Sequence, residues 1–289
     1  MDIQEIELQH GKYIDVLSDW GFKRMFGEEE RKQFLIDFVN SVLPDSNVQD
    51  ILYLPTEQQG LTIPDRNAIF DITCKDKDGS YFIVEVQKLH KHDFVDRAVF
   101  YSSFYLQRLE KGLKRYKLFP VHFISVLDYR EFDYDERVVR HGLIMDPEDH
   151  RVLSDAISLT FVELPKFRKE IGELENGSDE WCFVLKNIKS MSSMPEKMNP
   201  RFRPFFQAAE YLNLSHEERT TYDQEMDRER DRLAENQWAH DNGRAEGRAE
   251  GHEDTARELL REGFEDEMIL KVTKITSERL AELKRELDV

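Results

Sequence analysis

The sequence predicts an α/β fold, with one domain over residues 1–214 and a charged helical tail over residues 215–289. Between residues 28 and 127, apolar periodicity indicates the order helix, three strands, helix, strand. A second observation is an Asp-Gly turn between two short runs of β-branched and aromatic residues, which is typical of a β-hairpin. A third is the change after Leu214, where charged residues and glycine replace the apolar runs.

In the 289-residue chain, 39% of the residues are hydrophobic, which is enough to form a core. Charged residues make up 35%, which is high for a globular domain. Its formal net charge of −18 argues against broad nonspecific binding to nucleic acid. The charge is uneven: residues 88–117 hold eight Lys or Arg against three Asp or Glu, whereas the tail holds thirteen against twenty-two. Because no bilayer-length apolar run, signal-peptide pattern or disulfide framework is found, we expect a cytoplasmic protein with no membrane segment.

Two helices are expected before the first strand. The first is short, lies within residues 13–27 and turns its aromatic residues inward, and it carries Asp19 and Lys23 at i,i+4 spacing, either as a local pair or for a role at phosphate. The second spans residues 28–43 and ends at Pro44. Its acidic opening opposes the helix dipole and consists of Glu28, Glu29 and Glu30. A strand is expected over residues 48–54.

The hairpin spans residues 69–87. If its turn is centred on Asp78, Asp71 pairs directly with Glu85, and the two carboxylates converge on one face with the amide of Gln87. Such oxygen donors suit Mg²⁺ or Mn²⁺, and a divalent ion could lower the pKa of a water molecule and polarise a phosphoryl oxygen. The alternative is an ordinary amphipathic hairpin with its polar face in water. Asp65, after Pro64, is interpreted as a turn residue.

The elements after the hairpin begin with a basic helix over residues 93–117. Arg97 lies beside its apolar stripe, where it could contact a phosphate or pair with an acidic site residue. A buried strand follows over residues 121–127. We then expect strands over residues 138–145 and 157–164, and two helices marked by the apolar positions Trp181, Val184, Leu185, Ile188, Phe205, Phe206, Ala209 and Leu212.

Three motifs give the chain a family resemblance. They are Asp71 followed by Glu85-Val86-Gln87, the segment from Asp19 through Phe22-Lys23 to Phe26-Gly27, and the helix pattern from Phe94 through Arg97 to Tyr101. Together they resemble the PD-(D/E)XK nuclease superfamily, and more narrowly its transposase group, which includes the Rpn recombination-promoting nucleases. The resemblance implies a restriction-endonuclease-like αβββαβ core with a mixed central sheet.

The resemblance also implies a site and an activity, namely a Mg²⁺-dependent or Mn²⁺-dependent DNA endonuclease linked to DNA recombination. Asp71, Glu85 and the Val86 carbonyl would hold the metal, with Gln87 as a catalytic residue in place of the usual Lys. Candidate phosphate-binding residues are Lys23, Lys88 and Arg97. Some related nucleases draw a further metal carboxylate from the first helix, which leaves Glu28, Glu29 and Glu30 open.

The tail opens with a capping-box pattern at Ser215–Glu218 and repeats glycine at positions 243, 247 and 251. These glycines predict a solvated or marginal helix, and residues 255–289 predict short helices that could form a homo-oligomer. Two other functions stay open. One is a catalytically silent DNA-binding or regulatory protein with a nuclease fold. The other is an interaction protein that acts through its acidic helical tail.

Overall fold

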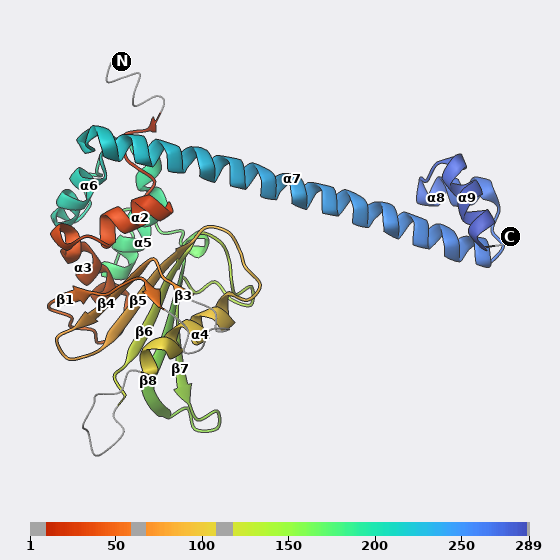
Figure 1. Cartoon of the computed structure of the whole chain (residues 1–289). Helices are drawn as coiled ribbons and strands as arrows, with labels where there is room; N and C mark the ends of the chain where they lie inside the picture. Colours follow the sequence, from red (N-terminus) through yellow and green to blue (C-terminus); the bar gives the residue numbers. More distant parts are fainter. Residues whose placement is uncertain (1–9, 59–67, 108–117, 288–289) are drawn as a thin grey trace. The chain divides into compact units, whose positions relative to one another are not determined.

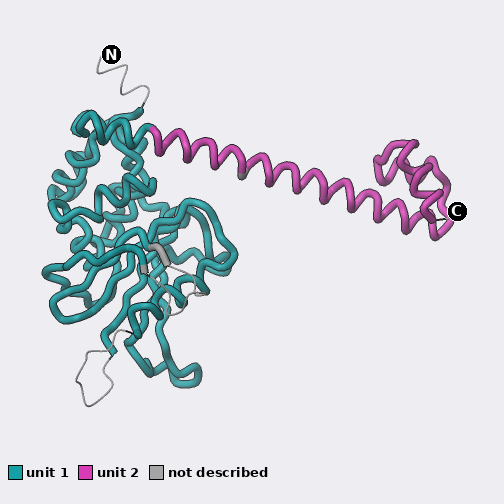
Figure 2. The backbone as a smooth tube through the Cα atoms, viewed as in Figure 1, with its two compact units in different colours: residues 1–223 teal, residues 224–289 magenta. Residues whose placement is uncertain are grey.

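A computed structural model describes residues 10–58, 68–107 and 118–287 (Figure 1). The chain divides into two compact units, and the boundary in the sequence falls between Asp223 and Gln224 (Figure 2). The first unit extends beyond Leu214 because the start of helix α7 (His216–Arg261) packs on it. Glu218 Oε1 lies 2.9 Å from Arg24 Nε, and the Tyr222 hydroxyl accepts the Asp15 N–H at 2.8 Å. Whether residues 1–214 fold independently stays a prediction.

A mixed sheet forms the centre of the first unit, with six strands in the described residues. In spatial order they are β1 (Ile51–Tyr53), β4 (Ile72–Asp76), β5 (Tyr81–Gln87), β6 (Val121–Leu127), β8 (Val152–Glu163) and β7 (Val139–Met145). Strands β5, β6 and β8 run parallel, and the other neighbours are antiparallel. The predicted mixed sheet is therefore confirmed. A separate two-stranded sheet pairs β2 (Glu57–Gln58) with β3 (Ala68–Ile69).

The helices of this unit are α2 (Asp19–Phe26), α3 (Lys32–Val42), α4 (Phe94–Leu106), α5 (Gly177–Asn187) and α6 (Arg203–Ala209). Elements α3, β1, β4, β5, α4 and β6 follow one another in the predicted αβββαβ order, and among the described residues only the small β2–β3 pair interrupts it. The restriction-endonuclease-like α/β core is thus confirmed.

Several predicted boundaries differ from the structure. The helix expected from residue 28 opens as a 3-10 turn at Glu29–Arg31, where Arg31 donates to the Arg24 carbonyl. The strand expected over residues 48–54 covers only Ile51–Tyr53, and the one expected over residues 157–164 begins earlier, at Val152. The run expected as one strand over residues 69–74 is split, because Ile69 pairs with β2 and β4 begins at Ile72. Residues 108–117 and Asp65 lie outside the described residues.

Both faces of the sheet bury apolar side chains. On one face, α4 covers a core that contains Phe70, Tyr81, Ile83, Phe123 and Phe161. Because side chains alternate along a strand, Glu85 lies on the same face as Tyr81 and Ile83. A second core joins α2, α3, α5 and α6 through ring contacts among Phe26, Phe38, Trp181 and Phe205. The end of β5 that carries Glu85 is therefore held from both sides.

The second unit contains most of α7, then α8 (Asp266–Thr273) and α9 (Ser277–Leu287). Its small core consists of Ala256, Leu260, Ile269, Leu280 and Leu283. Helix α7 is continuous through the three repeated glycines, and the predicted capping box is confirmed at its start, where Ser215 and Glu218 bond reciprocally. No helix in the described part of the chain is long and apolar enough to cross a bilayer.

Candidate metal and phosphodiester site

The β4–β5 hairpin brings Asp71 and Glu85 together. The ladder pairs Ile72 with Val84 and Lys75 with Tyr81, which is the register predicted from the Asp-Gly turn. Asp71 lies one residue before β4 and therefore stands opposite Glu85. Its Oδ2 accepts the Val86 N–H at 2.9 Å, so the carboxylate is fixed by the strand that carries Glu85 and Gln87.

The two carboxyl groups are buried with little compensation. Glu85 is 2% exposed, and among the described residues its Oε1 has no hydrogen-bond partner, while Oε2 accepts the Gln87 amide N–H at 3.2 Å. Burial raises the pKa of Glu85, and the neighbouring Asp71 charge raises it further. Burial also raises the pKa of Asp71, although the Val86 N–H opposes this rise. A bound cation would relieve both effects.

The donor set fits a hard divalent cation. Asp71, Glu85 and Gln87 supply carboxylate and amide oxygens, and the Val86 carbonyl is a further oxygen on the same strand. Within the described residues, no group of three or more His, Cys, Asp or Glu side chains is placed to hold a metal ion, so the two carboxylates have no third side chain of these types as a partner. An unpartnered buried carboxylate oxygen is instead the kind of atom that an oxygen-preferring ion such as Mg²⁺ or Mn²⁺ would pair.

The three acidic residues ahead of α3 make local contacts. Glu28 pairs with Arg31, and Glu29 Oε1 lies 2.7 Å from Lys32 Nζ. Glu30 is exposed. The structure therefore gives none of the three a contact that selects it as a further metal carboxylate, and the question stays open as the sequence left it.

The three candidate phosphate-binding cations occupy different surroundings. Lys23 Nζ lies 2.7 Å from Asp19 Oδ1, which is the i,i+4 pair, and 4.0 Å from Asp71 Oδ1, which places it at the site. Arg97 donates to the Tyr101 hydroxyl at 3.0 Å, and its charge opposes the rise in the pKa of Glu85. Lys88 pairs with buried Asp15 at 2.9 Å instead.

Two carboxylates that the sequence did not single out organise the surroundings. Asp15 Oδ2 accepts both Lys88 and Lys189, the latter at 2.6 Å. At the end of β8, Glu163 and Lys166 form a pair at 2.7 Å, and both side chains are 0% exposed. The sequence signal was present in each case, because Asp15 and Glu163 are single carboxylates inside apolar runs, where an unpaired charge would be costly.

The mixed sheet and its flanking helices are those of the PD-(D/E)XK class of nuclease folds. The model of the family described as PD-(D/E)XK nuclease family transposase matches residues 16–238, and the chain belongs to this family. Searches among curated proteins and among solved structures gave no match. The matched segment contains both the hairpin and the helices that hold it, so a nuclease-type function follows from the family.

Proposed function

We propose that the protein is a metal-dependent DNA endonuclease that hydrolyses phosphodiester bonds. The observation that carries this proposal is the buried pair of Asp71 and Glu85, in which one Glu85 oxygen has no partner among the described residues. Asp71, Glu85, Gln87 and the Val86 carbonyl would hold Mg²⁺ or Mn²⁺. Such an ion, when bound, supplies charge stabilisation at the phosphoryl group and a more acidic water.

The chain's own residues bind and orient the substrate. The Val86 N–H fixes Asp71, and the Gln87 amide fixes Glu85, so neither carboxylate must reorganise when DNA arrives. Lys23 and Arg97 lie beside these carboxylates and would attract the negatively charged backbone. The net charge of −18 makes this a local attraction, and we expect binding to weaken steeply with salt.

Gln87 supports a second candidate, a catalytically silent DNA-binding or regulatory protein. The resembling nucleases usually carry a Lys at this position, and a neutral amide supplies neither its positive charge nor its proton chemistry. In this structure the Gln87 amide instead donates to Glu85. Cytoplasmic location, a role in recombination, interactions through the tail and oligomerisation through the C-terminal helices stay predictions.

The two candidates separate in a nicking assay. Purified protein is incubated with supercoiled plasmid in Mg²⁺, Mn²⁺, Ca²⁺ or EDTA, and calorimetry measures Mn²⁺ binding in parallel. We expect nicking with Mg²⁺ or Mn²⁺, none with EDTA, and loss of both nicking and Mn²⁺ binding in Glu85→Gln. The matched control is Glu148→Gln, which neutralises an exposed glutamate of the same unit. If the parent binds Mn²⁺ but nicks the plasmid at none of the salt concentrations tested, the result would favour the catalytically silent protein.

A further inference from the structure

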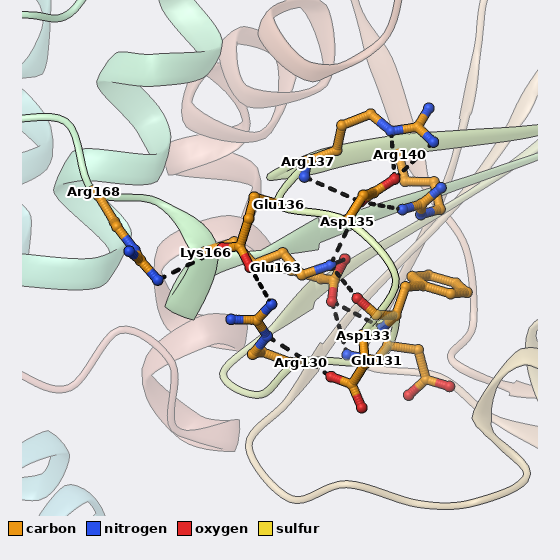
Figure 3. A network of polar contacts seen from close by, with 11 residues as sticks. Arg130, Glu131, Asp133, Asp135, Glu136, Arg137, Arg140, Glu163, Lys166 and Arg168 are labelled. Carbon is orange, nitrogen blue, oxygen red and sulfur yellow. Dashed lines mark hydrogen bonds and ion pairs between the residues drawn. The ribbon is translucent and has the colours of Figure 1, made fainter.

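The segment after β6 is fixed to the end of β8 by two buried side chains. Glu163 Oε1 accepts the backbone N–H groups of Glu131 and Phe132 at 2.8 and 3.1 Å. Glu163 Oε2 pairs with Lys166, which also donates to the Phe132 carbonyl (Figure 3). Because the backbone at residues 131 and 132 is held from both sides, the Glu131 side chain leaves it from a fixed position.

From this position, the Glu131 carboxyl group lies beside the His90 ring. Glu131 Oε2 is buried and lies 3.5 Å from His90 Nε2, and the Tyr129 ring meets the His90 ring edge to face at 5.1 Å. Burial raises the pKa of Glu131, and His90 opposes this rise. Within the described part of the chain, the titratable groups in contact with His90 are Glu131, Tyr129 and the neighbouring ring of His92. A distance of 3.5 Å is long for a hydrogen bond, as is common at such pairs before substrate binds.

Three observations place this cluster beside the hairpin carboxylates. Gln87 pairs with Leu127 in the β5–β6 ladder, and the Asp128 N–H donates to the Gln87 carbonyl at 2.9 Å, so Tyr129 follows directly. The second observation is that one cation acts on both groups. Burial raises the pKa of Tyr129 and the pKa of Glu85, and the Arg97 guanidinium opposes both rises.

The third observation concerns the residue after His90. The Lys91 charge lies close enough to Asp71 to oppose the rise in the pKa of that carboxyl. Two points of the loop between β5 and α4 are therefore close to the hairpin carboxylates, namely Gln87 at its start and Lys91, and His90 lies between them in the sequence.

We infer that His90, oriented by Glu131, accepts the proton of the attacking water during phosphodiester hydrolysis. The inference rests on the proposed function and names the water-activating group that the amide of Gln87 cannot supply. Glu131 faces Nε2, so the neutral ring carries its proton there and presents the Nδ1 lone pair. The water O–H bond breaks and an N–H bond forms at Nδ1. The water oxygen bonds to phosphorus, the bond from phosphorus to the leaving oxygen breaks, that oxygen takes a proton from solvent, and His90 returns its own proton to solvent.

His90 is the catalytic residue in this scheme, and Glu131 is a positioning residue. Glu163 and Lys166 act one step further away, because they hold the backbone from which Glu131 projects. The arrangement follows the general logic of an imidazole base whose second nitrogen is held by a carboxylate.

The first test reads the histidine tautomer by ¹⁵N NMR, without DNA and without metal. The sample carries ¹⁵N-histidine at all nine positions, at a pH where imidazoles are neutral, and the signals of His90 are those that disappear in His90→Gln. We expect the Nε2–H tautomer at His90 in the parent and a mixture of tautomers in Glu131→Gln. An Nδ1–H tautomer in the parent, or identical signals in parent and Glu131→Gln, would overturn the inference.

The second test measures nicking and Mn²⁺ binding together. We expect His90→Ala to nick about 10²- to 10⁴-fold more slowly, the usual contribution of a general base, with Mn²⁺ affinity unchanged and with partial recovery on addition of imidazole. The control His216→Gln, at an exposed histidine of the same unit, should retain the parental rate. A parental rate in His90→Ala, loss of Mn²⁺ binding or no recovery with imidazole would refute the role of His90 while the proposed function stands. A parent that never nicks would refute the proposed function, and this inference with it.

Discussion

Two buried glutamates at the ends of parallel strands in the same sheet, β5 and β8 on either side of β6, have opposite surroundings in this fold. Glu163, at the end of β8, is 0% exposed and has Lys166 and two backbone N–H groups as partners. Glu85, near the end of β5, is 2% exposed, receives one long amide hydrogen bond and keeps one oxygen without a partner among the described residues. The residue type and burial match, but the compensation does not.

Under the proposed function, the difference is that between a structural carboxylate and a metal-binding one. A buried charge is costly unless it is paired and hydrogen-bonded, and Glu163 meets both conditions. Glu85 meets neither fully: burial and the Asp71 charge raise its pKa, and the Arg97 charge only opposes this rise. The unsatisfied Glu85 is therefore where the proposed function places a bound ligand.

The largest expected effect comes from neutralising the unsatisfied pair. We expect Asp71→Asn and Glu85→Gln each to lower the nicking rate by about 10³-fold or more, because a metal ion's contribution of several kcal/mol is lost with its carboxylate. Initial rates of plasmid nicking in Mn²⁺ measure this effect.

The same variants should not destabilise the metal-free protein. Each removes a poorly compensated buried charge without changing side-chain size, so we expect a free energy of unfolding in EDTA at least as large as that of the parent. A variant that unfolds more easily than the parent would show that Asp71 and Glu85 are structural in the same sense as Glu163, and the comparison would fail.

Breaking the satisfied pair should have the opposite outcome. Lys166→Met leaves Glu163 buried without its cation, and we expect a loss of about 3–5 kcal/mol in the free energy of unfolding. Urea denaturation followed by circular dichroism measures the loss. Because Glu163 also holds the backbone of Glu131 and Phe132, the segment after β6 should become susceptible to proteolysis.

The double variant Glu163→Gln with Lys166→Met is the control for this interpretation. Removing both charges together should recover much of the lost stability, because no uncompensated charge remains. If Lys166→Met alone unfolds no more easily than the parent, the pair at the end of β8 contributes nothing to stability, and the contrast with Glu85 has no physical basis.

Local patterns were sufficient to predict the order of elements and the register of the hairpin. An Asp-Gly turn fixes the pairing, so the juxtaposition of Asp71 and Glu85 follows from residues within one short segment. The break in the strand at Phe70 and Asp71 was not predictable in this way. It depends on the Phe70 N–H, which donates to the Thr56 carbonyl outside the hairpin.

Side-chain partners that are distant in sequence were beyond sequence reasoning. Lys88 directly follows the Glu-Val-Gln segment and was expected at phosphate, yet its Nζ bonds to Asp15, 73 residues earlier. Glu131 and Glu163 meet across 32 residues because parallel strands β6 and β8 end side by side. A single charge in an apolar run indicates that a partner exists, but only the tertiary arrangement says which residue it is.

A smaller effect is expected at the Gln87 amide, which donates to the Glu85 side chain. Gln87→Ala removes the one hydrogen bond to the Glu85 side chain from its own strand, and a neutral ligand contributes less to holding a cation than a carboxylate does. We expect about a 10-fold loss in Mn²⁺ affinity and nicking rate. Calorimetry at matched salt concentration checks the affinity, and parental values in both measurements would mean that Gln87 is only a strand residue.

The smallest effect concerns Asp15, a third buried carboxylate, which resembles Glu163 in being paired. Burial alone would raise the pKa of Asp15, but Lys88 and Lys189 hold that pKa below its ordinary value. A carboxyl group whose pKa is lowered by folding stabilises the protein above its unfolded pKa of about 4, and this contribution is lost as the pH falls through the folded pKa. The advantage of the parent over Asp15→Asn in the free energy of unfolding should therefore be constant from pH 7 to about pH 5 and shrink below pH 4, as urea titrations at each pH would show. An advantage that is independent of pH would mean that Asp15 acts through the hydrogen bond that its Oδ1 accepts from the Leu17 N–H rather than through its charge.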